Sequence, residues 1–109
     1  MAKTIIDLIT SFPDDKLTLE HLGEELCEVG QIKSKVIRFG FEDEWPPGSG
    51  WTNRRKLIQE LGHILAVIDI LKAKGIVSQE EMDQYKTEKW QSMVKWNAYR
   101  GDKDDLKGE

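Results

Sequence analysis

The hydrophobic positions of this chain recur at the spacing of an α-helix over several long stretches. The first stretch runs from about Thr18 to Phe39, where apolar residues return every three or four positions and predict one amphipathic face. Its apolar members are Leu19, Leu22, Leu26, Val29, Ile32, Val36 and Phe39. Gly40 follows directly, which predicts that the helix ends at Phe39.

Two further helices are predicted downstream. Thr52 or Asn53 is a suitable cap for the second, whose hydrophobic density predicts a buried helix that stops at Gly75. Its apolar positions are Leu57, Leu61, Ile64, Leu65, Ile68 and Leu71. The segment Ser78-Gln79-Glu80-Glu81 is a capping box, which predicts a third helix that extends to about Arg100.

The remaining segments are short and carry signals that end helices. Residues 3–12 have a helical pattern stopped by Pro13, so we expect residues 1–16 to form a short N-terminal helix and a turn. Residues 41–51 contain Pro46-Pro47-Gly48-Ser49-Gly50 and predict a loop, which we expect to lie over the candidate site formed by the two long helices. The polar residues 101–109 predict a flexible tail. Because no strand pattern competes, the fold class is all-α, with residues 1–109 as a single helical domain.

Composition narrows the classes of partner. The net charge of −4 and the pI near 5.2 argue against a binder of nucleic acid polymers or of membrane surfaces. A helical chain of 109 residues with four Trp, three Phe and three Met buries only part of its apolar surface alone, so we expect a homodimer or homotetramer. Neither a signal peptide nor a membrane span is evident, and we expect a cytoplasmic protein. The single cysteine, Cys27, excludes a disulfide framework, and we expect it to be a small core residue.

Acidic side chains interrupt two of the helical repeats. Glu24, Glu25 and Glu28 fall within an arc of roughly 100° on the first long helix, so three carboxylates can converge. Glu60 and His63, three residues apart on the second helix, are placed to face them. Carboxylate oxygens are ligands that Mg²⁺ and Mn²⁺ prefer. The alternative is a solvated acidic face, which is common in a chain with 33% charged residues.

The two acidic segments resemble the motifs of one enzyme family. The stretch from Leu19 to Leu71 is similar to the all-α nucleoside triphosphate pyrophosphohydrolases of the MazG-like group, which includes the dimeric dUTPases. Their motif is E-E-x-x-E on one helix and E-x-x-D on the next; the first is complete in Glu24-Glu25-Leu26-Cys27-Glu28, whereas His63 stands where the family has Asp. Further segments of resemblance to the phage and bacterial branch are Ser34 to Gly40, Thr52 to Leu57, Glu60-Leu61-Gly62 and Ile64 to Asp69.

The resemblance implies a helical bundle that hydrolyses a (deoxy)nucleoside triphosphate to the monophosphate and pyrophosphate with Mg²⁺, or with Mn²⁺. It implies that Glu25, Glu28 and Glu60 are metal ligands, and that Glu24 is the general base or an outer ligand. These four glutamates are the predicted catalytic residues. The alternative function is a catalytically weakened nucleotide-binding or protein-interaction module on the same scaffold.

His63 has two interpretations that the sequence leaves open. As a fourth metal ligand, its imidazole would shift the preference from Mg²⁺ towards Mn²⁺. As a lone histidine on a buried helix face, it would be a hydrogen-bonded core residue. The spacing Glu60-x-x-His63 also occurs in di-iron carboxylate bundles, but these need the motif twice and this chain carries it once.

Basic and aromatic residues near the two acidic segments are candidates for binding substrate. Lys35 follows Glu28 by seven residues, which returns it to the same helix face two turns further on, within reach of a triphosphate. Trp51 could stack on a base or pin the loop. The predicted substrate-binding residues are Lys35, Arg38, Trp51, Asn53, Arg55 and Lys56. For the basic members, the alternative is ordinary solvated surface or a helical ion pair such as Lys56 with Glu60.

Overall fold

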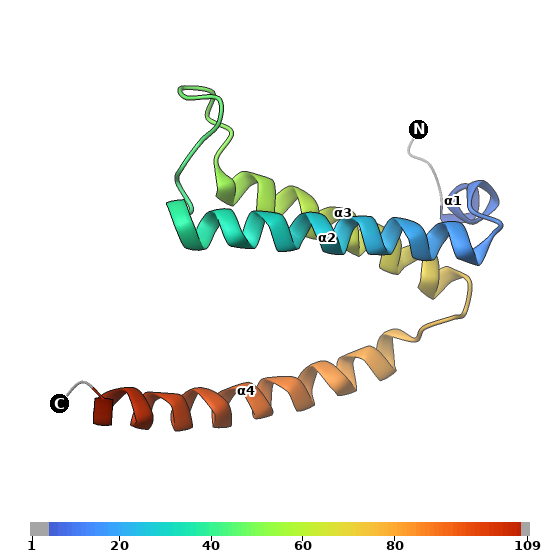
Figure 1. The fold of residues 1–109 in the computed structure, drawn as a ribbon. Coiled ribbons are helices and arrows are strands. Elements are labelled where there is room, and N and C mark those ends of the chain that lie inside the picture. The colour runs from blue at the N-terminus through green and yellow to red at the C-terminus, as the bar shows by residue number, and fades with distance from the viewer. Residues whose placement is uncertain (1–4, 108–109) are drawn as a thin grey trace. The chain divides into compact units, whose positions relative to one another are not determined.

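The computed structural model describes residues 5–107, apart from the side chains of Leu8 and of residues 99–107, and this part is all-α (Figure 1). Its helices are α1 (Ile5–Ser11), α2 (Asp15–Phe39), α3 (Asn53–Ala73) and α4 (Gln79–Lys107). The described residues contain no strand, only an isolated bridge between Glu44 and Thr52. The predicted fold class is therefore confirmed. None of the described helices combines the length and the apolar character that crossing a membrane requires.

The chain divides into two compact units, residues 1–76 and 77–109. The first unit contains α1, α2 and α3, and the second contains α4. The division falls just after Gly75, whose φ of 75° lies in the left-handed region that glycine adopts without strain. The candidate site described below belongs wholly to the first unit.

Helices α2 and α3 form an antiparallel hairpin, with α1 packed against α3 (Figure 1). The start of α2 meets the end of α3, where Lys74 Nζ donates a 2.8 Å hydrogen bond to Asp15 Oδ1. Only Ile32 of α2 and three residues of α3 are buried hydrophobic side chains among the described residues: Val67, Ile70 and Leu71. The hairpin core is therefore small, because most of the apolar repeat on each helix stays at least partly exposed.

The ends of α2 and α3 follow from their capping residues. Asp14 accepts a 2.9 Å hydrogen bond from the Lys16 amide and caps α2, so the helix begins three residues before the predicted Thr18. The Asp14-Asp15 pair is thus a helix start rather than only a turn. The predicted end of α2 is confirmed, since Gly40 adopts a φ of 92° and donates to the Val36 carbonyl. Thr52 caps α3 by accepting from the Arg55 amide.

The loop between α2 and α3 is held by one carboxylate. Glu44 accepts hydrogen bonds from the backbone amides of Gly48 and Gly50, at 2.5 and 2.9 Å. Gly48 and Gly50 have φ of 79° and 74°, as the tight turn requires. The loop projects from the end of the hairpin at which α2 stops and α3 begins (Figure 1), whereas Glu60 lies seven residues, or about 10 Å, into α3. The loop was predicted to lie over the site, but no residue of 41–51 belongs to the convergent group or to the adjoining cavity wall.

Helix α4 is longer than the sequence pattern predicts. Its start is confirmed, because Ser78 Oγ accepts from the Glu81 amide as the capping box requires. The predicted end at Arg100 is wrong, since the helix continues through Gly101 to Lys107. A single glycine costs a helix only about 1 kcal/mol relative to alanine, so Gly101 does not stop it. Of the predicted flexible tail, residues 101–107 are helical and residues 108–109 lie outside the described part.

Two burial predictions are wrong. Helix α3 is not buried all round, because Ile58, Leu61 and Leu65 are exposed. Cys27 is also exposed rather than part of the core, since it lies on the side of α2 turned away from the buried Ile32. In both cases the helical repeat is broader than the narrow face that one neighbouring helix covers.

Candidate metal centre

Three side chains from the two helices of the hairpin converge near its middle. Glu25 comes from α2, while Glu60 and His63 come from α3, where their i,i+3 spacing places them on one face. One potential ligand atom from each residue lies within 4.8 Å of the other two. His63 Nδ1 lies 3.2 Å from Glu25 Oε2 and 3.3 Å from Glu60 Oε2.

The two carboxyl groups of the centre shift each other's pKa in opposite directions. Glu60 is buried, and a hydrogen bond with Glu25, its burial, and a hydrogen bond and negative charge from Glu28 together raise the pKa of Glu60 to about 7. The hydrogen bond from Glu60 in turn lowers the pKa of Glu25. Near neutral pH, Glu25 is therefore ionised, whereas Glu60 is about half protonated.

His63 faces both carboxyl groups with the same nitrogen. Burial lowers the pKa of the imidazole, but hydrogen bonds to Glu25 and Glu60 and their charges outweigh it, so the pKa is raised overall. The side chain of His63 is 47% exposed, whereas those of Glu25 and Glu60 are 18% and 11% exposed. The interpretation of His63 as a core residue is therefore wrong, because it stands at the open edge of the centre.

The other two predicted acids take different places. Glu28 lies close enough to hydrogen-bond with Glu60 and raise its pKa, although it is outside the convergent group of three. Glu24 is 73% exposed, and its carboxylate lies 3.9 Å from Nδ1 of His21. The structure thus brings together Glu25, Glu60 and His63, places Glu28 beside them and leaves Glu24 on the outer surface of α2.

The convergent atoms fit a divalent cation. Ligand atoms bound at roughly 2.0–2.2 Å to one ion lie at most about 4.4 Å apart, and the observed group needs only a small contraction to satisfy this limit. Two carboxylates and one imidazole form a mixed set of oxygen and nitrogen ligands. This set suits Mn²⁺ better than Mg²⁺, because Mg²⁺ prefers oxygen ligands alone. Binding would release the proton of Glu60 and any proton on His63 Nδ1.

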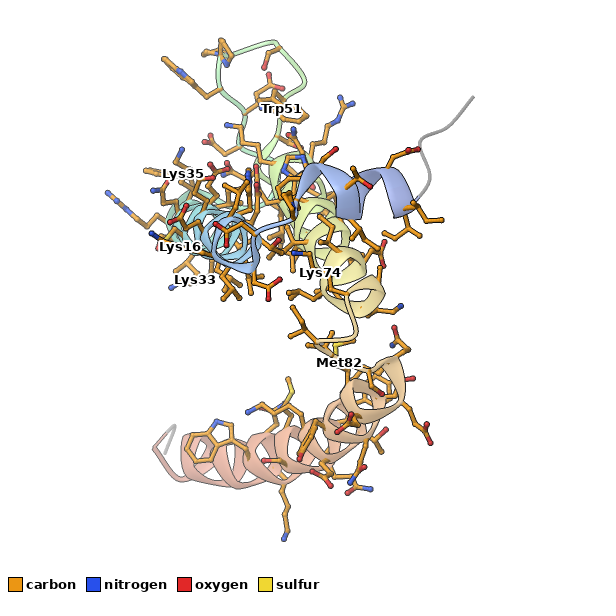
Figure 2. All side chains as sticks on the ribbon, turned by 90° about the vertical axis from the view of Figure 1, so that its right-hand side faces the viewer. Lys16, Lys33, Lys35, Trp51, Lys74 and Met82 are labelled. Carbon is orange, nitrogen blue, oxygen red and sulfur yellow. The ribbon has the colours of Figure 1, made fainter. Side chains whose placement is uncertain are left out.

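Some of the predicted basic residues are exposed, and others contact neighbouring residues of the protein. Lys35 is exposed, and the view along α2 shows it leaving the helix on the side towards which the loop bearing Trp51 projects, whereas Lys33 leaves on the opposite side (Figure 2). Arg38 is also exposed, with its guanidinium 5.2 Å from the centre of the neighbouring Phe39 ring. Lys56 is half-buried near the start of α3.

Arg55, Trp51 and Asn53 have structural contacts of their own. The guanidinium of Arg55 lies 5.7 Å from the centre of a Trp51 ring and donates to the Gly50 carbonyl. Asn53 is buried, and its Nδ2 donates a 3.0 Å hydrogen bond to the Gly40 carbonyl. These contacts tie the loop to the start of α3. Substrate binding by these residues stays a prediction. The side-chain nitrogen of Asn53 already donates a hydrogen bond to the Gly40 carbonyl.

The sequence pattern missed a cavity that adjoins the centre. It has a volume of about 310 Å³ and includes Glu25 and His63 in its wall. Three further members of the wall, none of them predicted, are Phe12, Thr18 and His21. One signal was present in the sequence, because Thr18 precedes Glu25 by seven residues and so shares its face of α2.

Comparison of the chain with protein-family models, with curated proteins and with solved structures found no match.

Proposed function

We propose that this protein is a metal-dependent pyrophosphohydrolase that converts a (deoxy)nucleoside triphosphate to the monophosphate and pyrophosphate. The proposal starts from the resemblance of Leu19–Leu71 to the MazG-like group. The observation that carries it is the convergence of Glu25, Glu60 and His63, which occupy three positions of the resembling motifs and lie on two different helices. A solvated acidic face does not require a buried carboxyl group, whereas Glu60 is buried and contacts the same imidazole as Glu25 of the other helix.

The candidate ligands of the cation are Glu25, Glu60 and His63, with Glu28 as the nearest further carboxylate. A bound Mg²⁺ or Mn²⁺ would neutralise the phosphates and lower the pKa of the attacking water. Glu28 is better placed than Glu24 to extend this set or to accept the proton of that water, since Glu24 lies at the exposed surface beside His21. The resemblance alone implied Glu28 as a ligand and Glu24 as the general base or an outer ligand, so the base role is the one that moves to Glu28.

Lys35 is the strongest candidate for a residue that binds phosphate. It lies two helical turns from Glu28 on the same face of α2, and its ammonium group is exposed. Arg55 is held against Trp51 and Gly50, so its guanidinium position is defined before any ligand arrives. A preorganised guanidinium binds phosphate with a smaller loss of side-chain entropy than a free one.

We further propose that the active form is a homodimer or homotetramer. Exposed hydrophobic residues line one side of each hairpin helix: Leu19, Leu26 and Ile37 on α2, and Ile58, Leu61 and Leu65 on α3. Their spacings of three, four, seven and eleven residues place each set on one face. Contiguous exposed apolar residues of this kind mark association surfaces.

The direct test is turnover. The protein would be incubated with a panel of ribo- and deoxynucleoside triphosphates in Mg²⁺ or Mn²⁺, and the products separated by ion-exchange chromatography. We expect monophosphate and pyrophosphate in equal amounts, and no diphosphate with free phosphate. Glu25→Gln should abolish the reaction while the helical circular dichroism stays unchanged, and Glu20→Gln, an exposed change on the same helix, should leave it intact.

The same experiment separates the alternative function. A catalytically weakened binding module would bind a triphosphate in calorimetry but release no pyrophosphate with either ion. Diphosphate production, or full turnover by Glu25→Gln, would contradict the proposed reaction and its site.

A further inference from the structure

The cavity beside the candidate metal centre is large enough for part of a ligand. Its volume of about 310 Å³ is at the small end of the range of roughly 300–1,000 Å³ for small-molecule sites. Because Glu25 and His63 belong both to the metal centre and to the cavity wall, a ligand in the cavity would adjoin any group bound at the centre.

Most of the wall is apolar or aromatic. Ala66, Val67 and Ile70 contribute from α3, and the rings of Phe12 and His21 meet edge to face, with centroids 5.2 Å apart and planes at 77°. Aromatic faces and edges of this kind pack well against flat rings. The wall therefore suits an uncharged planar group rather than a phosphate or a sugar chain.

One polar atom of the wall lacks a partner. Thr18 is fully buried, and its Oγ1 has no hydrogen bond to any described atom. Buried hydroxyl groups in folded proteins are nearly always hydrogen-bonded, so an orphan hydroxyl in a cavity wall indicates a ligand partner. Because the side chain is closed off from water, such a partner would reach it by displacing a neighbouring wall residue. Phe12, in the short connection between α1 and α2, belongs to the same wall.

We propose that this cavity binds the nucleobase of the substrate and that the hydroxyl of Thr18 hydrogen-bonds to the edge of the base. The proposal rests on the proposed function, which places the phosphates of the same molecule at Glu25, Glu60 and His63. A nucleobase is planar and uncharged, and its edge presents adjacent donors and acceptors. A hydroxyl both donates and accepts, so Thr18 can satisfy such an edge.

The test uses free nucleosides, which lack the phosphates and need neither metal nor hydrolysis. Ion-free, ¹⁵N-labelled protein would be titrated with each of the four deoxynucleosides, and the amide shifts followed by NMR. We expect at least one nucleoside to shift the amides of Thr18, His21 and Val67. Thr18→Val keeps the shape of the side chain and removes the hydroxyl. It should weaken the binding of that nucleoside by about three- to tenfold. Thr18→Ser, which keeps the hydroxyl, should retain most of the affinity.

The outcomes separate this inference from the proposed function. Nucleoside binding that depends on the Thr18 hydroxyl, in a protein without turnover, would support the pocket and overturn the hydrolase. Turnover with the same KM in wild type and Thr18→Val would support the hydrolase and overturn the pocket. The pocket is also overturned if no nucleoside shifts these amides. The same holds if Thr18→Val changes only the melting temperature, as expected for a hydroxyl that bonds back to the Asp14 carbonyl within the helix.

Discussion

The Nδ1 atom of His63 lies 3.2 Å from Oε2 of Glu25, and this contact joins α3 to α2 across 38 residues of sequence. The same nitrogen lies 3.3 Å from Oε2 of Glu60, so one imidazole contacts two carboxyl groups, one from each helix. We therefore expect replacement of His63 to change metal preference, pH dependence and hairpin stability together.

Replacing His63 by Asp should change which ion the protein prefers. The wild type should favour Mn²⁺ over Mg²⁺ in turnover and in thermal stabilisation, because the imidazole nitrogen suits the transition ion. His63→Asp creates an oxygen-only set, so the Mg²⁺ response should rise. Without metal, three adjacent carboxyl groups should lower the melting temperature of the variant. Titration of both ions, monitored by melting temperature and by pyrophosphate release, checks this. His63→Asn, which is neutral and similar in size, is the control; an unchanged metal preference in His63→Asp would remove His63 from the centre.

The ion-free protein should lose stability as the pH rises from about 5 to 8. Glu60 has a pKa raised from 4.5 to about 7 in the folded state, so the fold binds this proton more tightly than the unfolded chain does. The resulting stabilisation is full below pH 4.5 and is lost as the pH passes through 7. The raised pKa of His63 acts in the same direction, with its contribution present below pH 6.5 and lost at higher pH. Melting temperatures in chelator from pH 5 to 8 measure the slope.

Glu60→Gln provides the matched comparison, because glutamine has a similar shape and does not titrate. Most of the slope should disappear in this variant, leaving only the contribution of His63. Saturating Mn²⁺ should also reverse the trend in the wild type, since the ion replaces the proton and binds better as the pH rises. An equal slope in Glu60→Gln would show that other groups cause the pH dependence.

Asn53→Ala should destabilise the first unit without touching the acidic centre. The side chain is buried, and its Nδ2 donates to the Gly40 carbonyl at the end of α2. Removing the donor breaks this part-buried hydrogen bond, which costs about 0.5–1.5 kcal/mol. Urea unfolding of wild type and variant measures the difference. Asn97→Ala, at an exposed position of α4, should change stability by less than about 0.5 kcal/mol. A variant as stable as wild type would show that the contact is dispensable.

Charged residues on the exposed face of α3 should break the expected assembly. Leu61 and Leu65 are exposed and lie four residues apart on one face, next to Ile58. If this face joins subunits, Leu61→Glu combined with Leu65→Glu buries two charges in an apolar contact and should produce monomers. Sedimentation equilibrium at micromolar concentration measures the mass, with the exposed change Gln59→Glu as the control. A wild type that sediments as a monomer would contradict the assembly itself.

Local sequence determined where most of the helices begin and end. Gly40, Thr52 and Ser78 act through their own backbone or side-chain hydrogen bonds, which involve residues at most four positions away. The same local physics explains the two boundary errors. Asp14 caps α2, although a turn was predicted there. Gly101 lies inside α4, because a long helix tolerates one glycine.

Tertiary structure alone decided which predicted ligands meet. Periodicity places Glu24, Glu25 and Glu28 on one arc of α2, but only the packing of α3 turned Glu25 towards Glu60 and His63 and left Glu24 in solvent. The burial of Thr18 and the exposure of Cys27 have the same origin. A helical repeat specifies the faces of a helix, whereas the neighbour that covers a face depends on contacts between residues dozens of positions apart, which the local sequence pattern does not contain.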